Sequence, residues 1–180
     1  MDHDAGRPAS DFRTSQTTFM DADDDEILTD IDYRTASLIR IPRNHQEPVQ
    51  VLRYGVSEKY SAHHDYFNPK LYKNDIETLK LIQHGKRNRF VTVFWYLSTV
   101  PEGGETIFPR AFGQYERSTN DCDTGLKVRP ESGKVILFYN MKMDGTVDPQ
   151  SLHGACPVRQ GIKWAANKWV WNEPMSYVPL

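Results

Sequence analysis

Residues 151–164 read SLHGACPVRQGIKW, a stretch in which one histidine and one lysine flank two turn-forming residues. His153 and Lys163 lie ten positions apart, and Pro157 and Gly161 stand between them. If two antiparallel strands fold back here, the histidine and the lysine become near neighbours across the strands, with Cβ atoms about 5 Å apart. We therefore predict one pocket that a potential metal ligand and a fixed cation share.

Composition limits the classes of protein that fit. The 180 residues suffice for one domain with a sizeable core. A hydrophobic content of 38% and a formal net charge of −2 argue against a disordered chain and against a strongly basic nucleic-acid binder. No apolar run approaches the length of a membrane span. The first residues carry no apolar signal region, so the residues alone leave the compartment unknown, as they do the oligomeric state.

The two cysteines, Cys122 and Cys156, are too few for a disulfide framework. No CxxC pair occurs, so a thiolate zinc site is not expected. From the residues alone, one disulfide and two buried thiols are equally good readings.

The pattern along the chain predicts a mainly β protein with one helix near its start. We expect residues 1–20 to be a loose lead-in and residues 21–180 to form a single domain. The acidic run 21–26 precedes apolar residues at helical spacing, which predicts a helix that ends before Pro42. A solvated helix start explains this run better than a cation site does.

From residue 48 onward, short β-branched and aromatic segments alternate with polar turns, which is typical of strands. Residues 89–98 read as a strand buried on both faces. Residues 67–88 read either as a connection with a short helix over 75–83 or as a substrate loop. Some eight strands in all favour a jelly roll or sandwich with one helix packed outside.

Three side chains suggest a metal site. His63 and Asp65 share one face of a strand, because they are two positions apart, while His64 points away. With His153 they form the two-histidine, one-carboxylate set of non-haem Fe(II) oxygenases. An HxD pair by itself more often marks two surface polar residues, and an isolated lysine such as Lys163 is most often exposed. Together with His153, however, Lys163 supplies a cation for the far carboxylate of a co-substrate chelated to the metal.

Several further stretches carry a family pattern. In chain order they are RTS at 13–15, YG at 54–55, HHDYF at 63–67, YLS at 96–98, GGETIFP at 103–109, VRP at 128–130, the stretch 151–164, and NKW at 167–169. With these motifs the sequence resembles the catalytic domain of prolyl 4-hydroxylases, within the 2-oxoglutarate- and Fe(II)-dependent dioxygenases. The resemblance runs over nearly the whole chain from about residue 12.

The resemblance implies a double-stranded β-helix (jelly roll) with an N-terminal helix packed against it. It also implies roles for eight residues: Fe(II) ligands His63, Asp65 and His153; Lys163 paired with the distal carboxylate of 2-oxoglutarate; Tyr54 and Thr106 lining that co-substrate pocket; Arg89 and Trp169 near a peptide substrate. Plain core packing remains the alternative for Tyr54, Thr106 and Trp169.

The activity implied by the resemblance is hydroxylation of peptidyl proline at C4 by O₂ and 2-oxoglutarate, giving 4-hydroxyproline, succinate and CO₂, with ascorbate as a further cofactor. One alternative is an oxygenase of the same mechanism that acts on lysyl side chains, a free amino acid or a nucleic acid, the last disfavoured by the lack of a basic surface. Others are a non-catalytic module that binds proline-rich peptides and a purely structural jelly roll.

The resemblance carries three more expectations. It implies a disulfide between Cys122 and Cys156, since some relatives carry a partner cysteine near position 122. It implies the endoplasmic reticulum or secretory pathway as the compartment. Domains of this family usually begin earlier, so we expect an upstream strand or helix to be absent from the sequence given.

Overall fold

The computed structural model describes residues 12–23, 25–113 and 122–175. The strands and α-helices are β1 (Gln16–Met20), α2 (Glu26–Ile39), β2 (Val49–Tyr54), β3 (Tyr60–His63), α3 (Ile76–Leu81), β4 (Arg89–Tyr96), β5 (Glu102–Gly103), β6 (Thr106–Phe108), β7 (Leu126–Val128), β8 (Val135–Tyr139), β9 (His153–Ala155), β10 (Val158–Gln160) and β11 (Lys163–Trp171). Short 3₁₀ turns lie at Arg43–His45, Gln83–Gly85, Ala111–Gly113 and Pro149–Ser151.

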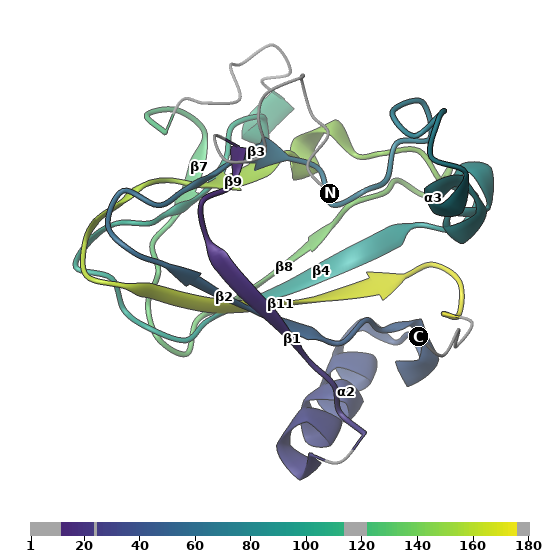
Figure 1. Cartoon of the computed structure of the whole chain (residues 1–180), viewed down its shortest axis with the longest axis horizontal. Helices are drawn as coiled ribbons and strands as arrows, with labels where there is room; N and C mark the ends of the chain where they lie inside the picture. Colours follow the sequence, from purple (N-terminus) through teal and green to yellow (C-terminus); the bar gives the residue numbers. More distant parts are fainter. Residues whose placement is uncertain (1–11, 24, 114–121, 176–180) are drawn as a thin grey trace.

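Two antiparallel sheets form the body of the protein. The larger has the strand order β1-β2-β11-β4-β8, and the smaller has the order β3-β9-β6-β7. Figure 1 shows the long strands of the larger sheet side by side, with β3, β7 and β9 in a second layer across the molecule. Going along the chain from β2 to β4, each strand lies in the sheet opposite to the one before it. Segments distant in sequence therefore face one another across the interior.

The centre of the larger sheet is its most buried part. β11 pairs with β2 on one side and with β4 on the other. Val91 and Val170 are completely buried, as is Ala165. The β-branched and aromatic residues of β4 suit a pleated strand covered on both faces, which confirms the sequence interpretation of this segment.

Helix α2 covers the outer face of the larger sheet (Figure 1). Asp25 caps the helix, because its carboxylate accepts hydrogen bonds from the backbone N–H groups of Ile27 and Leu28. Leu28 packs against Val49 of β2 and Ala166 of β11. The helix start predicted from the acidic run is thus confirmed.

A buried ion pair joins α2 to the sheet. Lys168 of β11 bonds Asp32 of the helix, and Arg43 lies 3.6 Å from the same carboxylate. The helix therefore presents Asp32 to the sheet, whereas Ile27 and Leu38 are exposed.

The predicted hairpin between His153 and Lys163 is wrong. β9, which carries His153, pairs with β3 and β6 in the smaller sheet, whereas Lys163 begins β11 in the larger sheet, opposite Tyr54. The intervening β10 pairs with β5 instead. Pro157 has no N–H for a ladder and Gly161 has a positive φ, so the chain crosses between sheets here instead of folding back on itself.

Other boundaries also differ from expectation. Residues 16–20, placed in a loose lead-in, form β1 and pair with β2 along its length. Residues 67–88 contain the short helix α3, which confirms the first of the two readings of this connection. Eleven strands are described where the sequence suggested some eight.

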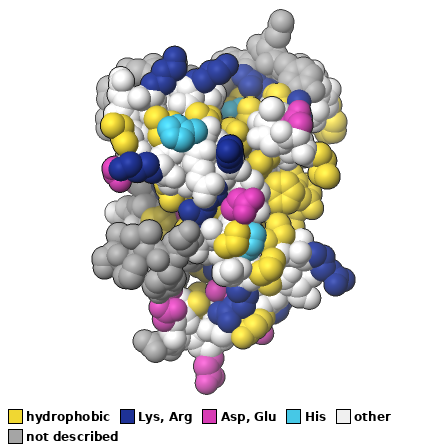
Figure 2. Space-filling model, turned by 90° about the vertical axis from the view of Figure 1, so that its right-hand side faces the viewer, with side chains coloured by type: hydrophobic (Ala, Val, Ile, Leu, Met, Phe, Trp, Pro, Cys, Tyr) yellow, Lys and Arg dark blue, Asp and Glu magenta, His cyan; other side chains and the backbone are white. Residues whose placement is uncertain are grey.

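No described helix is long and apolar enough to cross a membrane. On the face shown in Figure 2, acidic, basic and hydrophobic side chains are interspersed, and no single sign of charge dominates it.

Candidate active site

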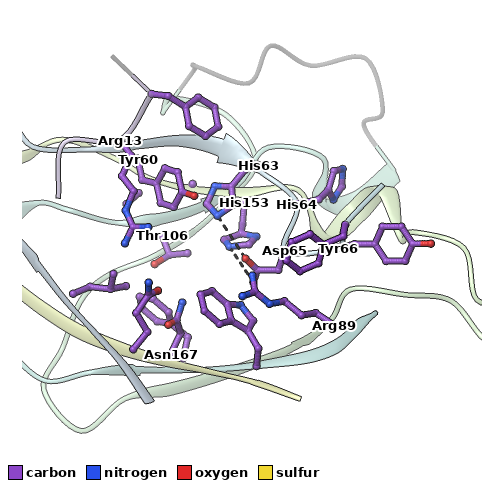
Figure 3. A pocket seen from close by; sticks show the side chains of 18 of the residues that line it. Arg13, Tyr60, His63, His64, Asp65, Tyr66, Arg89, Thr106, His153 and Asn167 are labelled. Carbon is purple, nitrogen blue, oxygen red and sulfur yellow. Dashed lines mark ion pairs between the residues drawn. The ribbon is translucent and has the colours of Figure 1, made fainter. Parts of the chain in front are cut away.

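Two histidines and one aspartate meet inside the molecule. His63 ends β3 and lies directly opposite His153 at the start of β9. Asp65 follows just after the strand ends, so its place depends on the bend there. One potential ligand atom from each of the three lies within 4.8 Å of the others. Figure 3 shows the three side chains pointing toward one another.

Backbone carbonyls fix both imidazole rings. The Nδ1 atom of His63 lies 2.9 Å from the Ser61 carbonyl oxygen, and Nδ1 of His153 lies 2.9 Å from the Ser151 carbonyl oxygen. A carbonyl only accepts, so each Nδ1 is the donor, which leaves Nε2 as the ring nitrogen that can bind a metal. The two Nε2 atoms face Asp65 at 3.6 and 3.7 Å. Both rings are thereby oriented as metal ligands are.

The absence of a side chain at position 154 allows this approach. A Cβ on Gly154 would lie 2.8 Å from the Tyr60 carbonyl oxygen and 3.0 Å from the Ala62 nitrogen. β9 therefore packs against β3 at a distance that brings His153 opposite His63.

A hydrogen-bond chain holds the aspartate from behind. The hydroxyl of Thr92 donates to Asp65 Oδ2 at 2.7 Å, and the Asn140 amide donates to Thr92 Oγ1 at 2.9 Å. All three residues are buried. The carboxylate is therefore fixed by β4 and by the end of β8, strands of the opposite sheet.

The electrostatics of the cluster suit a cation. Burial alone raises the pKa of Asp65, but His153 and His63 beside it outweigh burial and hold that pKa well below its ordinary value. Burial lowers the pKa of His153 to about 4, although Asp65 opposes this. Near neutral pH the cluster thus offers an ionised carboxylate and a neutral imidazole, which are the forms that bind a divalent metal.

His64 stands apart from this cluster. Its Nδ1 lies 3.2 Å from the Ser151 hydroxyl, and that hydroxyl donates to the Asp148 carbonyl oxygen. Its side chain also lines the cavity described below. The structure therefore separates His64 from the converging set, as the spacing predicts, although His64 still faces the interior.

Three aromatic rings surround the ammonium group of Lys163. Its ammonium nitrogen is 5.3 to 5.6 Å from the ring centroids of Tyr54, Phe94 and Tyr96. The residue is completely buried, and its ammonium group donates a hydrogen bond to the Gly104 carbonyl oxygen at 2.7 Å. Burial lowers the pKa of Lys163 to about 7, with Glu105 opposing the shift. An ammonium group with a single described acceptor fits an incoming carboxylate.

The two hydroxyl residues predicted beside the lysine are also placed there. Tyr54 is the strand partner of Lys163 and lines the cavity. The Tyr96 hydroxyl donates to Thr106 Oγ1 at 2.7 Å, so the Thr106 hydroxyl keeps its own proton for another acceptor. Burial raises the pKa of Tyr96 to about 12. The part of the cavity lined by Tyr54 and Thr106 therefore offers a hydroxyl donor, with the Lys163 ammonium group close to the Tyr54 ring.

One cavity of about 660 Å³ connects the cluster with Tyr54 and Thr106, and Arg89 and Trp169 form part of its wall. The guanidinium carbon of Arg89 lies 3.4 Å from the ring centroid of Trp169 and 4.9 Å from that of Phe67. Glu47 accepts two hydrogen bonds from Arg89, at 2.6 and 2.8 Å, and a third from Trp171 Nε1. Burial lowers the pKa of Arg89, but Glu47 outweighs burial and raises it.

Two polar atoms on the same wall have no partner within the described part of the chain. They are the indole Nε1 of Trp169 and the amide Oδ1 of Asn167, both on buried side chains of β11 that line the cavity. One is a donor and the other an acceptor, so together they match the N–H and C=O groups of a peptide.

Sequence reasoning missed the supporting residues, namely Glu47, Thr92, Tyr96, Asn140 and Asn167. Each has a polar group buried in or beside a strand, which the alternation of residues does not distinguish from core packing. Asn167 and Tyr96 lie within the matched motifs, and their position there was the one available signal.

Cys122 and Cys156 form a disulfide. This agrees with the pairing implied by the resemblance, where the residues alone left two readings. The bond ties the segment before β7 to the residue after β9 and thus to the strand of His153.

Comparisons with known proteins agree with this geometry. The family model described as the 2OG-Fe(II) oxygenase superfamily matches residues 49–171. Probable prolyl 4-hydroxylase 4 of Arabidopsis thaliana is 37% identical over 178 residues, and prolyl 4-hydroxylase 2 of the same plant is 38% identical. Each alignment covers 94% of this chain but 56% of the relative, so the chain spans a little over half the length of these relatives.

A solved structure shows the same likeness. The viral collagen prolyl hydroxylase of Paramecium Bursaria Chlorella virus-1, in complex with 2OG, superposes with a TM-score of 0.67 at 25% identity. The match covers 88% of this chain and 79% of the viral one. With the family model spanning both sheets and the His–Asp–His cluster between them, the chain belongs to the 2OG-Fe(II) oxygenase superfamily.

Proposed function

We propose that this protein hydroxylates peptidyl proline at C4, using O₂ and 2-oxoglutarate and giving 4-hydroxyproline, succinate and CO₂. The observation that carries the proposal is the convergence of His63, Asp65 and His153 in a cavity that reaches the surroundings of Lys163. The names of the relatives supply the substrate class, peptidyl proline.

The ligand set fits Fe(II). Two imidazoles and one carboxylate on one side of an ion leave the opposite positions open. When bound, Fe(II) and 2-oxoglutarate supply the oxidising chemistry that delivers one oxygen atom of O₂ to the proline. His63, Asp65 and His153 hold the ion, and Thr92 keeps the Asp65 carboxylate in place. Tyr60 stacks on the His63 ring at 3.8 Å and restricts its rotation.

Lys163 takes the role of the co-substrate cation in this proposal. Its ammonium group pairs with the distal carboxylate of 2-oxoglutarate, while Tyr54 and Thr106 offer hydroxyl groups to the same molecule. The rings of Tyr54, Phe94 and Tyr96 exclude water from the ion pair, which strengthens it.

The peptide lies against the wall formed by Arg89 and Trp169. Arg89 is held by Glu47 and flattened against Trp169, so it serves as a rigid surface. The unpartnered atoms of Asn167 and Trp169 bind the peptide backbone. Positioning of this kind brings the target carbon to the oxidising centre and keeps water out.

Mass spectrometry of proline-rich peptides whose two termini are capped tests the proposal. After incubation with Fe(II), 2-oxoglutarate and ascorbate, we expect a gain of one oxygen atom on proline and one succinate for each hydroxyproline. Peptides that bind without gaining oxygen would instead identify a non-catalytic binding module. Succinate formed only with lysyl peptides or with free amino acids would instead identify an oxygenase of the same mechanism that acts on those substrates.

We also infer that the two sheets form a double-stranded β-helix with α2 against it. The alternation of strands between the sheets and their antiparallel pairing support this. A single domain would then begin with β1, because β1 extends the larger sheet.

The disulfide supports an oxidising compartment such as the secretory pathway, since bonds of this kind persist there. Two free thiols in protein purified from its source under denaturing conditions would contradict this. Ascorbate is proposed as a further cofactor on the basis of the family resemblance. Comparing prolonged reactions with and without ascorbate tests whether the enzyme needs it to stay active.

A further inference from the structure

The cavity wall carries positive charge that its own residues do not balance. Three arginines line the cavity, Arg13, Arg89 and Arg110, against one carboxylate, that of Asp65. Glu47 neutralises Arg89 through its paired hydrogen bonds. Arg13 and Arg110 make no ion pair with any residue that the structure describes. Fe(II) and 2-oxoglutarate bring equal and opposite charges, and Lys163 offsets Asp65, so their binding leaves this excess unchanged.

The two unbalanced arginines line the same cavity as the metal-binding cluster. The guanidinium of Arg13 lies 4.8 Å from the Tyr60 ring centroid, and Tyr60 in turn stacks on His63. Arg110 acts electrostatically on His64, which lies beyond the cluster. Figure 3 shows Arg13 and His64 on opposite sides of the converging side chains. A peptide that enters the cavity therefore meets two cations that no described carboxylate balances.

Each arginine also has a buried nitrogen without an acceptor within the described ranges, Nη2 for Arg13 and Nε for Arg110. Arg13 is partly committed elsewhere, because its Nε donates to the Ser15 hydroxyl at 2.8 Å and its face covers Tyr60. Within the part of the chain that the structure describes, Arg110 makes no hydrogen bond, ion pair or ring contact. A carboxylate matches a guanidinium in both charge and planar geometry.

From these contacts we propose that the substrate peptide carries a carboxylate close to the target proline, and that Arg110 binds it. The inference rests on the proposed function and narrows the substrate class to acidic prolyl peptides. Arg110 is then a specificity-determining residue, and Arg13 contributes a second attractive charge.

Peptides with capped termini that differ at one position test whether the substrate carries such a carboxylate. Glu, Gln or Lys is placed one or two residues before or after the target proline. Binding to the full chain with Fe(II) and 2-oxoglutarate is measured by calorimetry without O₂, so that no turnover occurs. We expect a Glu peptide at one of these positions to bind about tenfold more tightly than its Gln counterpart, and the Lys peptide to bind more weakly. High salt should shrink the difference.

Variants of the chain locate the effect. The preference for Glu should disappear in Arg110→Gln, persist in Arg110→Lys, and be unchanged in Arg34→Gln, which alters an exposed arginine of α2. If the Gln variant folds poorly, the peptide series on the unaltered chain still decides the inference. Equal binding of Glu and Gln peptides at every position, or a Glu preference that survives in Arg110→Gln, would overturn the inference.

Turnover separates the inference from the function on which it rests. If Glu and Gln peptides are hydroxylated with equal kcat/KM, the proposed function stands and this inference fails. If no prolyl peptide gains oxygen while acidic peptides still bind through Arg110, the proposed function fails and the binding preference stands.

Discussion

The two ends of the site differ in how the protein balances the charge at each end. At one end, His63, His153 and Asp65 are oriented by hydrogen bonds from behind, and the surroundings favour an ionised carboxylate. At the other end, Lys163 has one described acceptor among three aromatic rings, and burial opposes its charge. The first end is built before its ion arrives, whereas the second gains its counter-charge only when an anion binds. Changes at the two ends should therefore have different signatures.

The largest expected effect is at the metal end. Asp65→Ala and His63→Ala should each lower succinate production about 100-fold or more, because each removes a proposed ligand and its hydrogen-bond partners. His64→Ala is the matched control and should retain most of the activity, since His64 lies outside the converging set. Equal losses in all three variants would mean that the wrong histidine is assigned.

At the other end, Lys163→Ala should raise the KM for 2-oxoglutarate about 30-fold or more, because it removes one partner of a buried charge pair. Turnover at saturating 2-oxoglutarate should change much less, and iron affinity should not change. Steady-state kinetics and metal titration measure the three quantities. An unchanged KM would contradict the role given to Lys163.

A smaller effect tests the preformed character of the metal end. Thr92→Val keeps the size of the side chain but removes the hydroxyl that donates to Asp65. We expect Fe(II) affinity to fall about tenfold, the lower range for loss of such a supporting hydrogen bond. Thr146→Val, in the exposed turn with Asp144, serves as a control. Competition with a chelator measures both, and equal affinities of Thr92→Val and the unaltered protein would show that the carboxylate needs no such support.

The smallest effect is a pH dependence at the lysine end. Burial lowers the pKa of Lys163 to about 7, so below that pH the ammonium form is already present. Above pH 7 the binding of 2-oxoglutarate must take up a proton, and its affinity should fall by at most about tenfold per pH unit. Calorimetry in buffers of different ionisation enthalpy detects this proton uptake. In Lys163→Ala the dependence should be absent, and an unaltered protein without it would contradict the assignment.

The sequence predicts the site residues better than it predicts the pairing of the strands that carry them. The residues alone suggest His63, Asp65 and His153 as one set with Lys163 nearby, and the resemblance adds their roles. The three ligand candidates do converge, but the expected strand face is only partly right, because β3 ends at His63 and Asp65 follows in a bend. Lys163 lies beside Tyr54, which lines the cavity. The roles of these residues remain predictions. The hairpin expected between His153 and Lys163 was wrong, because strand pairing across the two sheets depends on contacts distant in sequence.

The supporting residues were the least predictable. Thr92 reads as one more residue of a buried strand, and only the folded arrangement brings it to Asp65. Similarly, Glu47 lies 42 positions from Arg89 and 124 from Trp171, so no local pattern joins them. The exposure of Ile27 and Leu38 has the same origin, since the Asp32–Lys168 pair sets which side of α2 faces the sheet.

One measurement tests the central claim most directly. Crystals grown without O₂ in the presence of Fe(II) and 2-oxoglutarate can be examined by anomalous diffraction at the iron edge. We expect one iron peak bounded by Nε2 of His63, Nε2 of His153 and the Asp65 carboxylate, with 2-oxoglutarate extending from it to Lys163. Iron bound elsewhere, or a co-substrate whose far carboxylate does not reach Lys163, would contradict the account.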